Sequence, residues 1–89
     1  MIEREIEIVN RLGLHARAAA KFVTLASAFE AEITLEREGR TVNGKSIMGV
    51  MMLAASRGTR LTLRADGPDE AEAVEKLEEL VRNRFDEAQ

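Results

Sequence analysis

The chain contains a single histidine, His15, and its close neighbours are of types that bind phosphate. Gly13 lies two residues before it and Arg17 two residues after it. A neutral imidazole has an ordinary pKa of about 6.5, so it is a nucleophile near neutral pH. A phosphoryl group on a ring nitrogen has a high transfer potential and passes readily to another molecule. These residue types favour transient phosphorylation of His15, and with it a role as a carrier.

The pattern of apolar residues places His15 at the start of a helix, which we expect to span about 16–29. The first four N–H groups of a helix lack intrahelical partners, and together with the helix dipole they attract anions. We expect the backbone N–H groups of Ala16 and Arg17, and the Arg17 guanidinium, to bind the phosphoryl oxygens. Gly13 permits the close turn before the ring.

Simpler interpretations of His15 remain open at this point. A lone histidine at a helix start is often only a cap or a surface residue. No Asp or Glu lies between Val9 and Phe29 or between Gly39 and Ala65, which suits a site that accepts an added anion. With no acidic residue nearby in sequence to orient the ring, no nucleophile elbow and no metal-ligand spacing, a hydrolase is disfavoured. We expect a carrier that is not an enzyme and needs no metal or cofactor.

A second candidate site begins at Ser46, which we expect to cap a short helix over about 47–54. A phosphate on Ser46 would meet the helix dipole and Lys45. The helix is apolar all round, so a domain of this size cannot bury all of it. Methionine adapts to several partners, although each one could instead fill a gap in the core. We expect an exposed docking surface made of Ile47, Met48, Met51 and Met52.

Alternating hydrophobicity predicts four strands, at about 2–9, 31–38, 40–42 and 59–65, and a last helix at about 69–84. The order is βαββαβα. Strands with one apolar and one polar face imply a sheet that is covered on one side only. We therefore predict an α+β fold, an open-faced β-sandwich in which three helices cover a four-stranded, mostly antiparallel sheet. At 89 residues we expect a single domain over 1–89.

Composition excludes several classes of protein. The net charge is −3 and only 3% of residues are aromatic, which argues against nucleic-acid binding. No apolar stretch approaches the ~20 residues that cross a bilayer, so we expect no membrane insertion. The first residues are too charged for a secretory signal, and there is no cysteine. We expect a cytoplasmic monomer.

Two motifs resemble those of the HPr family, the phosphocarriers of the bacterial phosphoenolpyruvate-dependent phosphotransferase system. The first is Leu12-Gly-Leu-His15-Ala-Arg17 followed by Ala19-Ala-Lys21-Phe22, and the second is Asn43-Gly-Lys-Ser46-Ile-Met-Gly-Val-Met51. The resemblance implies that enzyme I phosphorylates Nδ1 of His15, that Arg17 supports the phosphoryl group, and that an enzyme IIA protein receives it. It also implies Ser46 as a site for an HPr kinase/phosphorylase in some bacteria. We expect Lys21 to join the docking surface.

One residue departs from the family pattern, in which proline usually follows the active-site arginine. Ala18 occupies that place here and should leave the first helical turn looser. The stretch 15–22 and the tail 84–87 look more like the nitrogen-regulatory (NPr) branch, so sugar uptake need not be the main task. An alternative is a regulatory interaction module that docks through the second helix without phosphotransfer.

Overall fold

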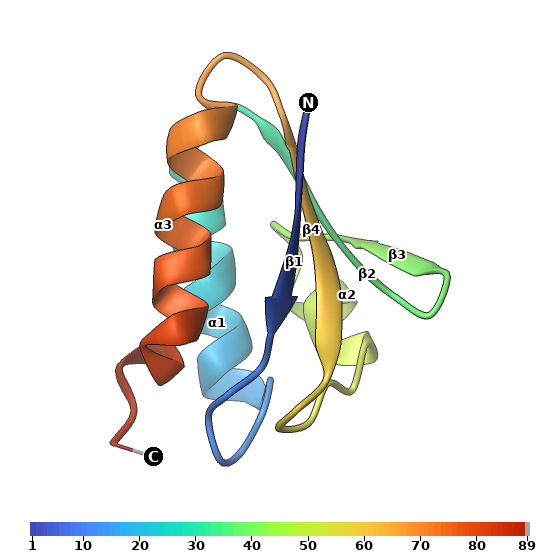
Figure 1. Ribbon diagram of the computed structural model, residues 1–89, viewed down its shortest axis with the longest axis vertical. Helices are drawn as coiled ribbons and strands as arrows, with labels where there is room; N and C mark the ends of the chain where they lie inside the picture. Colours follow the sequence, from blue (N-terminus) through green and yellow to red (C-terminus); the bar gives the residue numbers. More distant parts are fainter. Residues whose placement is uncertain (89) are drawn as a thin grey trace.

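Strands and helices alternate along the chain in a computed structural model, which describes residues 1–88 (Figure 1). The elements are β1 (Ile2–Glu7), α1 (Ala16–Ala26), β2 (Glu32–Arg37), β3 (Arg40–Asn43), α2 (Ile47–Met52), β4 (Arg60–Asp66), α3 (Glu70–Arg82) and the 3-10 turn η1 (Arg84–Asp86). The predicted order of strands and longer helices is confirmed.

The four strands form one antiparallel sheet in the order β1-β4-β2-β3, so β4 pairs with both β1 and β2. Apolar residues meet across this register, with Leu35 opposite Leu63 and Ile6 opposite Leu61. The β2–β3 hairpin turns through Glu38 and Gly39, both at positive φ (49° and 85°). Such two-residue turns match the twist of the flanking strands. The sheet is the antiparallel one that the alternation predicts.

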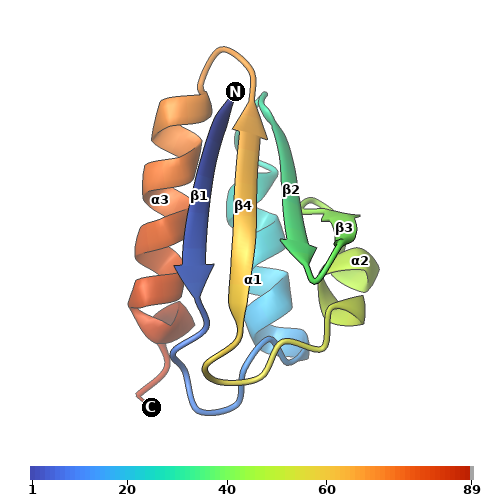
Figure 2. The ribbon, with the colours of Figure 1, turned by 45° about the vertical axis from the view of Figure 1, so that its right-hand side comes forward.

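Helices α1 and α3 lie side by side and antiparallel over one face of the sheet, and α2 packs against α1 and β3 (Figures 1 and 2). The core between these layers is apolar and includes Phe22, Leu63, Leu77 and Val50. On the opposite face Arg64 pairs with Glu36 and Glu3, at 2.6 and 3.1 Å. The open-faced sandwich is confirmed, with one face of the sheet packed and the other polar.

All three helices are shorter than their sequence pattern predicts, and α2 ends at Met52 rather than near residue 54. Helix α1 ends at Ala26 rather than near residue 29, although Phe29 is still buried. The chain leaves the helix because the Asp69 carboxylate accepts the N–H groups of Glu30 and Ala31, both at 2.9 Å. Helix α3 ends at Arg82, and η1 follows it.

Helix α2 is only six residues long, and side chains satisfy its backbone at both ends. Ser46 Oγ accepts the N–H of Gly49 at 3.1 Å, which confirms Ser46 as the N-cap. At the other end Arg37 donates to the carbonyls of Leu53 and Ala54, at 2.8 and 3.0 Å, and Arg40 donates to that of Met52. Cations at a helix C-terminus also complement its dipole. The β2–β3 hairpin therefore holds α2 in place.

Candidate functional site

His15 is the N-cap of α1, as its position in the sequence predicts. Its backbone is extended (φ −72°, ψ 176°), and its carbonyl accepts the N–H of Ala19 at 2.8 Å. The side chain makes no capping hydrogen bond. Because the ring does not occupy the helix end, the N–H groups of Ala16 and Arg17 remain directed at the space beside it. The geometry is that of an anion site next to an imidazole.

Gly13 fixes the loop that carries the ring. Its φ is +70°, and a Cβ added there would lie 2.5 Å from the carbonyl oxygen of Ala55. The next residue, Leu14, donates its N–H to that same oxygen at 2.8 Å. Only glycine fits both the left-handed conformation and the close approach. The loop is therefore held against the segment that follows α2, which brings the α2 surface next to His15.

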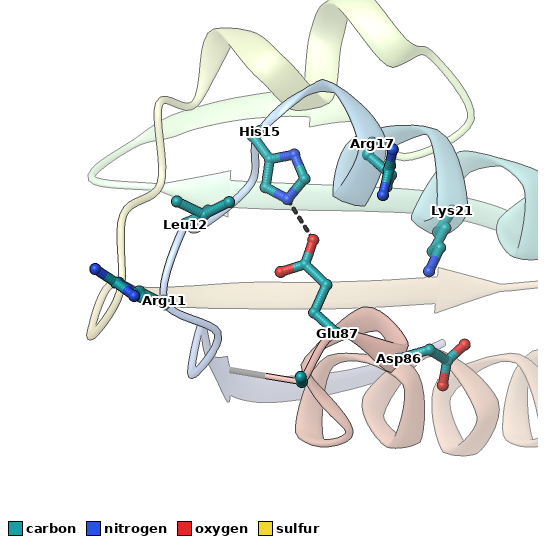
Figure 3. A pocket seen from close by; sticks show the side chains of 8 residues that line it. Arg11, Leu12, His15, Arg17, Lys21, Asp86 and Glu87 are labelled. Atoms are coloured by element: carbon teal, nitrogen blue, oxygen red, sulfur yellow. Dashed lines mark hydrogen bonds and ion pairs between the residues drawn. The ribbon is translucent and has the colours of Figure 1, made fainter.

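An open pocket of about 800 Å³ surrounds His15 (Figure 3). Three parts of the chain line it: the loop before α1, the first turns of α1 and the C-terminal tail. Their residues are Arg11, Leu12, His15, Arg17, Lys21, Asp86, Glu87 and Ala88. The structure thus brings together the predicted residues His15, Arg17 and Lys21, and adds a tail that the local sequence does not connect to them.

Glu87 contacts the ring, which corrects the expectation of surroundings free of acidic groups. His15 Nε2 is hydrogen bonded to Oε2 of Glu87 (Figure 3). The other carboxylate oxygen, Oε1, accepts a hydrogen bond from Asn10 Nδ2 at 3.0 Å. His15 and Glu87 are 72 residues apart, so no local pattern reveals the contact. Two features of the sequence indicate the contact only weakly. Asn10 directly follows the first predicted strand, and the apolar Phe85 lies within a charged tail.

The Glu87 carboxylate is charged at neutral pH. Burial by itself would raise the pKa of Glu87, but the hydrogen bonds from Asn10 and His15 and the charges of His15 and Lys21 outweigh burial and lower it. A charged carboxylate only accepts hydrogen bonds, so the hydrogen in its contact with the ring belongs to Nε2. The other ring nitrogen, Nδ1, points away from Glu87 (Figure 3).

The tail reaches the ring through a left-handed turn. Arg84, Phe85 and Asp86 all have positive φ, at 58°, 54° and 64°, which non-glycine residues rarely adopt. Burial of Phe85, which is fully covered, offsets this strain. Lys21 Nζ also donates to the Phe85 carbonyl at 2.7 Å. The turn follows α3 and places Glu87 beside the start of α1.

The predicted docking surface is exposed. The exposed fractions of Ile47, Met48, Met51 and Met52 are 43%, 73%, 39% and 59%, while Val50 of the same helix is buried. Lys21 is half-buried at the edge of the His15 pocket. Lys45 donates to the Phe29 carbonyl at 2.7 Å, which occupies one of the three N–H donors of its ammonium group.

Residues 1–88 contain neither a membrane-spanning helix nor a cluster of metal-binding side chains. None of the helices there is both long and apolar enough to cross a bilayer. In the same residues no three His, Cys, Asp or Glu side chains gather as a metal ion would require.

Comparison with known proteins places the chain in a family. The family model for the HPr component of the PTS, described as its phosphorylation site, matches residues 2–83. The chain belongs to the HPr family. Curated members bear the name phosphocarrier protein, so the family consists of carriers rather than enzymes. The HPr of Cupriavidus necator is 53% identical over 89 residues, with all of both chains covered.

Solved structures of HPr proteins agree with this fold. An HPr from Thermoanaerobacter tengcongensis superposes with a TM-score of 0.96 at 47% identity, and the match covers all of both chains. A structure described as an HPr dimer from the same organism has a TM-score of 0.79 at 48% identity, covering 98% of this chain and all of the other. A monomeric state for the present chain stays a prediction.

Proposed function

We propose that this HPr accepts a phosphoryl group on Nδ1 of His15 from phosphorylated enzyme I and passes it to an enzyme IIA protein. The observation that carries the proposal is the orientation of the ring. His15 sits at the start of α1, Nε2 contacts Glu87, and Nδ1 faces away from that carboxylate (Figure 3). We expect this exchange to take place in the cytoplasm.

Each transfer forms one bond to phosphorus and breaks another. The Nδ1 lone pair attacks phosphorus while the bond from phosphorus to the donor breaks, and that electron pair stays with the donor. The transition state spreads charge over the equatorial oxygens, so catalysis is mainly positioning and electrostatic stabilisation. The N–H groups of Ala16 and Arg17 and the Arg17 guanidinium supply that stabilisation. Transfer to enzyme IIA is the same step with the roles reversed.

Incubation with phosphoenolpyruvate and enzyme I should give one phosphate per chain, labile to acid and stable to base. His15→Ala should abolish this label. Retention of the label in that variant would overturn the assignment to His15.

Arg17→Ala should slow labelling by about 10–100-fold, the effect of losing one charge-assisted hydrogen bond. Lys76→Ala is the matched control, because it removes the same charge from an exposed position on α3. Equal rates in the two variants would exclude a specific role for Arg17.

Partner docking is proposed for Ile47, Met48, Met51 and Met52 together with Lys21. Met51→Asp should abolish binding of enzyme I and enzyme IIA, because it puts a charge into an apolar interface. Lys76→Asp introduces the same side chain outside this surface and should leave binding intact. If His15→Ala binds partners normally and the wild-type protein takes no label, the chain acts as an interaction module without phosphotransfer.

We also propose that phosphorylation of Ser46 regulates partner docking. The proposal rests on the half-buried Ser46 hydroxyl, which caps α2 beside the docking surface. A phosphate there would add negative charge next to Ile47 and Met48. Incubation with ATP and an HPr kinase should label the wild-type protein but not Ser46→Ala.

Membership of the NPr branch likewise stays a prediction. Comparing the labelling rates with sugar-type and nitrogen-type enzyme I tests it.

A further inference from the structure

Asn10 is fully buried, and both of its amide hydrogen bonds are made by the same nitrogen. Nδ2 donates to the Gly13 carbonyl at 2.8 Å and to Oε1 of Glu87 at 3.0 Å. Its Oδ1 is buried and has no hydrogen-bond partner among the described residues. Because both partners are acceptors, the amide cannot be turned over without losing both bonds. A buried unpaired oxygen costs stability, so packing alone does not explain an asparagine here.

The two acceptors of Asn10 are the parts that position His15. Gly13 belongs to the loop that precedes the ring, and Glu87 is the residue that touches Nε2. Asn10, three residues after β1, therefore joins the C-terminal tail to the loop that carries His15. Glu87 also lies outside residues 2–83, the part matched by the family model.

We propose that Asn10 and Glu87 are positioning residues for phosphotransfer. Asn10 holds the Glu87 carboxylate against Nε2 of His15, which keeps the ring hydrogen on Nε2 and the lone pair on Nδ1. The inference rests on the proposed function and deepens it. It assigns to the tail of this chain a role in preparing the nucleophile.

The same contact stabilises the ring during transfer. When Nδ1 bonds to phosphorus and the donor leaves with its electron pair, Nε2 keeps its hydrogen and the ring gains positive charge. The Glu87 carboxylate neutralises that charge, as a carboxylate does behind a catalytic histidine. Nε2 and Nδ1 lie on different edges of the ring, so the carboxylate stays clear of the phosphoryl oxygens (Figure 3). When the group moves on, the N–P electron pair returns to Nδ1.

Four other charged residues line the pocket around the ring: Arg11, Arg17, Lys21 and Asp86. Of these, Asp86 provides the control for substitutions of Glu87. It carries the same charge as Glu87 and lines the same pocket, but it makes no hydrogen bond to His15 among the described residues. Asp86→Asn removes that charge, and asparagine tolerates the positive φ found there.

The first test reads the tautomer of unphosphorylated His15 and needs no phosphotransfer. Two-dimensional NMR correlating the ring ¹⁵N and carbon-bound ¹H nuclei would be recorded at about pH 8.5, two units above the ordinary imidazole value. Wild-type protein and Asp86→Asn should show the Nε2–H tautomer alone, and Glu87→Ala should show a mixture. A pure Nε2–H form in Glu87→Ala would overturn the proposal.

The second test measures the rate at which phosphorylated enzyme I labels each variant. Glu87→Ala should be about tenfold slower than wild type, the lower end of the loss seen when the hydrogen-bond partner of a metal-bound histidine is removed. Asp86→Asn should stay within about twofold of wild type. Equal rates in Glu87→Ala and wild type would show that the contact does not assist transfer. If the wild-type protein takes no label, the proposed function fails while the tautomer result still stands.

Asn10→Ala tests the contribution of the Asn10 side chain separately from that of the Glu87 carboxylate. With Glu87 still present, this variant should show the same tautomer mixture as Glu87→Ala, and circular dichroism would report whether it folds. If it folds and keeps the pure Nε2–H form, Asn10 is not a positioning residue. If it does not fold, the Glu87→Ala result decides.

Discussion

Gly13 is the residue on which the position of the His15 loop depends. Its φ of +70° is left-handed, and a Cβ there would meet the Ala55 carbonyl at 2.5 Å. Gly39 also has a positive φ, +85°, but a Cβ there would have nothing within 4 Å. Both glycines have a positive φ, but only Gly13 has backbone atoms close to the position of an added Cβ. Substituting each one therefore separates the cost of the left-handed conformation from the cost of the steric clash.

Gly13→Ala should lower the free energy of unfolding by about 2–4 kcal/mol, since a clash with backbone adds to the left-handed penalty. Gly39→Ala should cost about 1–2 kcal/mol, from the left-handed penalty alone. Urea unfolding of both variants provides the comparison. Equal losses would mean that the loop moves away from Ala55 freely and that Gly13 is needed only for its φ.

At the scale of elements, the first turn of α1 contains both the proposed phosphate-binding N–H groups and Ala18, the residue that departs from the family pattern. Ala18 is fully buried and lies in that turn, where a backbone N–H has no intrahelical acceptor. Proline, the residue usual in the family, would remove a donor that the helix does not use and would restrict the unfolded chain. It would leave the N–H groups of Ala16 and Arg17 in place.

Ala18→Pro should raise stability by about 0.5 kcal/mol, or the melting temperature by roughly 2–4 °C. Ala20→Pro is the control, because it lies deeper in α1 and should cost about 3 kcal/mol. Thermal unfolding followed by circular dichroism checks both. A lower melting temperature for Ala18→Pro would show that the buried site at residue 18 does not admit the ring.

At the scale of the whole molecule, carboxylates join segments that are distant in sequence. The N–H groups of Glu30 and Ala31 outweigh burial and lower the pKa of Asp69, which ties the loop after α1 to the start of α3. The Gly67 N–H and the N-terminal ammonium group lower the pKa of Glu70. With Glu87, these groups connect the N-terminus, the α1–β2 loop and the tail to the body of the fold.

Acid should therefore destabilise the fold. A carboxylate whose pKa is lower in the folded state stabilises it above the ordinary value of about 4 and ceases to do so as pH falls through the lowered value. We expect the free energy of unfolding to be nearly constant from pH 7 to about 5 and to decline below about 4. Urea unfolding across this range checks the trend. Asp69→Asn should show a shallower decline, and curves parallel to wild type would exclude a contribution from Asp69.

Much of the fold could be predicted because its signals are local. Alternation in β2 and β4, the Glu38-Gly39 turn and the cap at Ser46 each depend on neighbouring residues. The site was partly predictable for the same reason, since His15, Arg17 and Gly13 lie within one loop and one helical turn. The end of α1 was not predictable, because the bonds that terminate it come from Asp69, about 40 residues later.

The sequence by itself determined the candidate nucleophile, its place at a helix start, the exposed face of α2 and the family. The tertiary structure alone decided what surrounds the ring. It brings Glu87 onto Nε2, and the buried Asn10 holds that carboxylate in place. The physical reason is that a tautomer and its charge partner depend on distances in space, and the left-handed turn at 84–86 with the burial of Phe85 sets those distances. No window of sequence around His15 contains them.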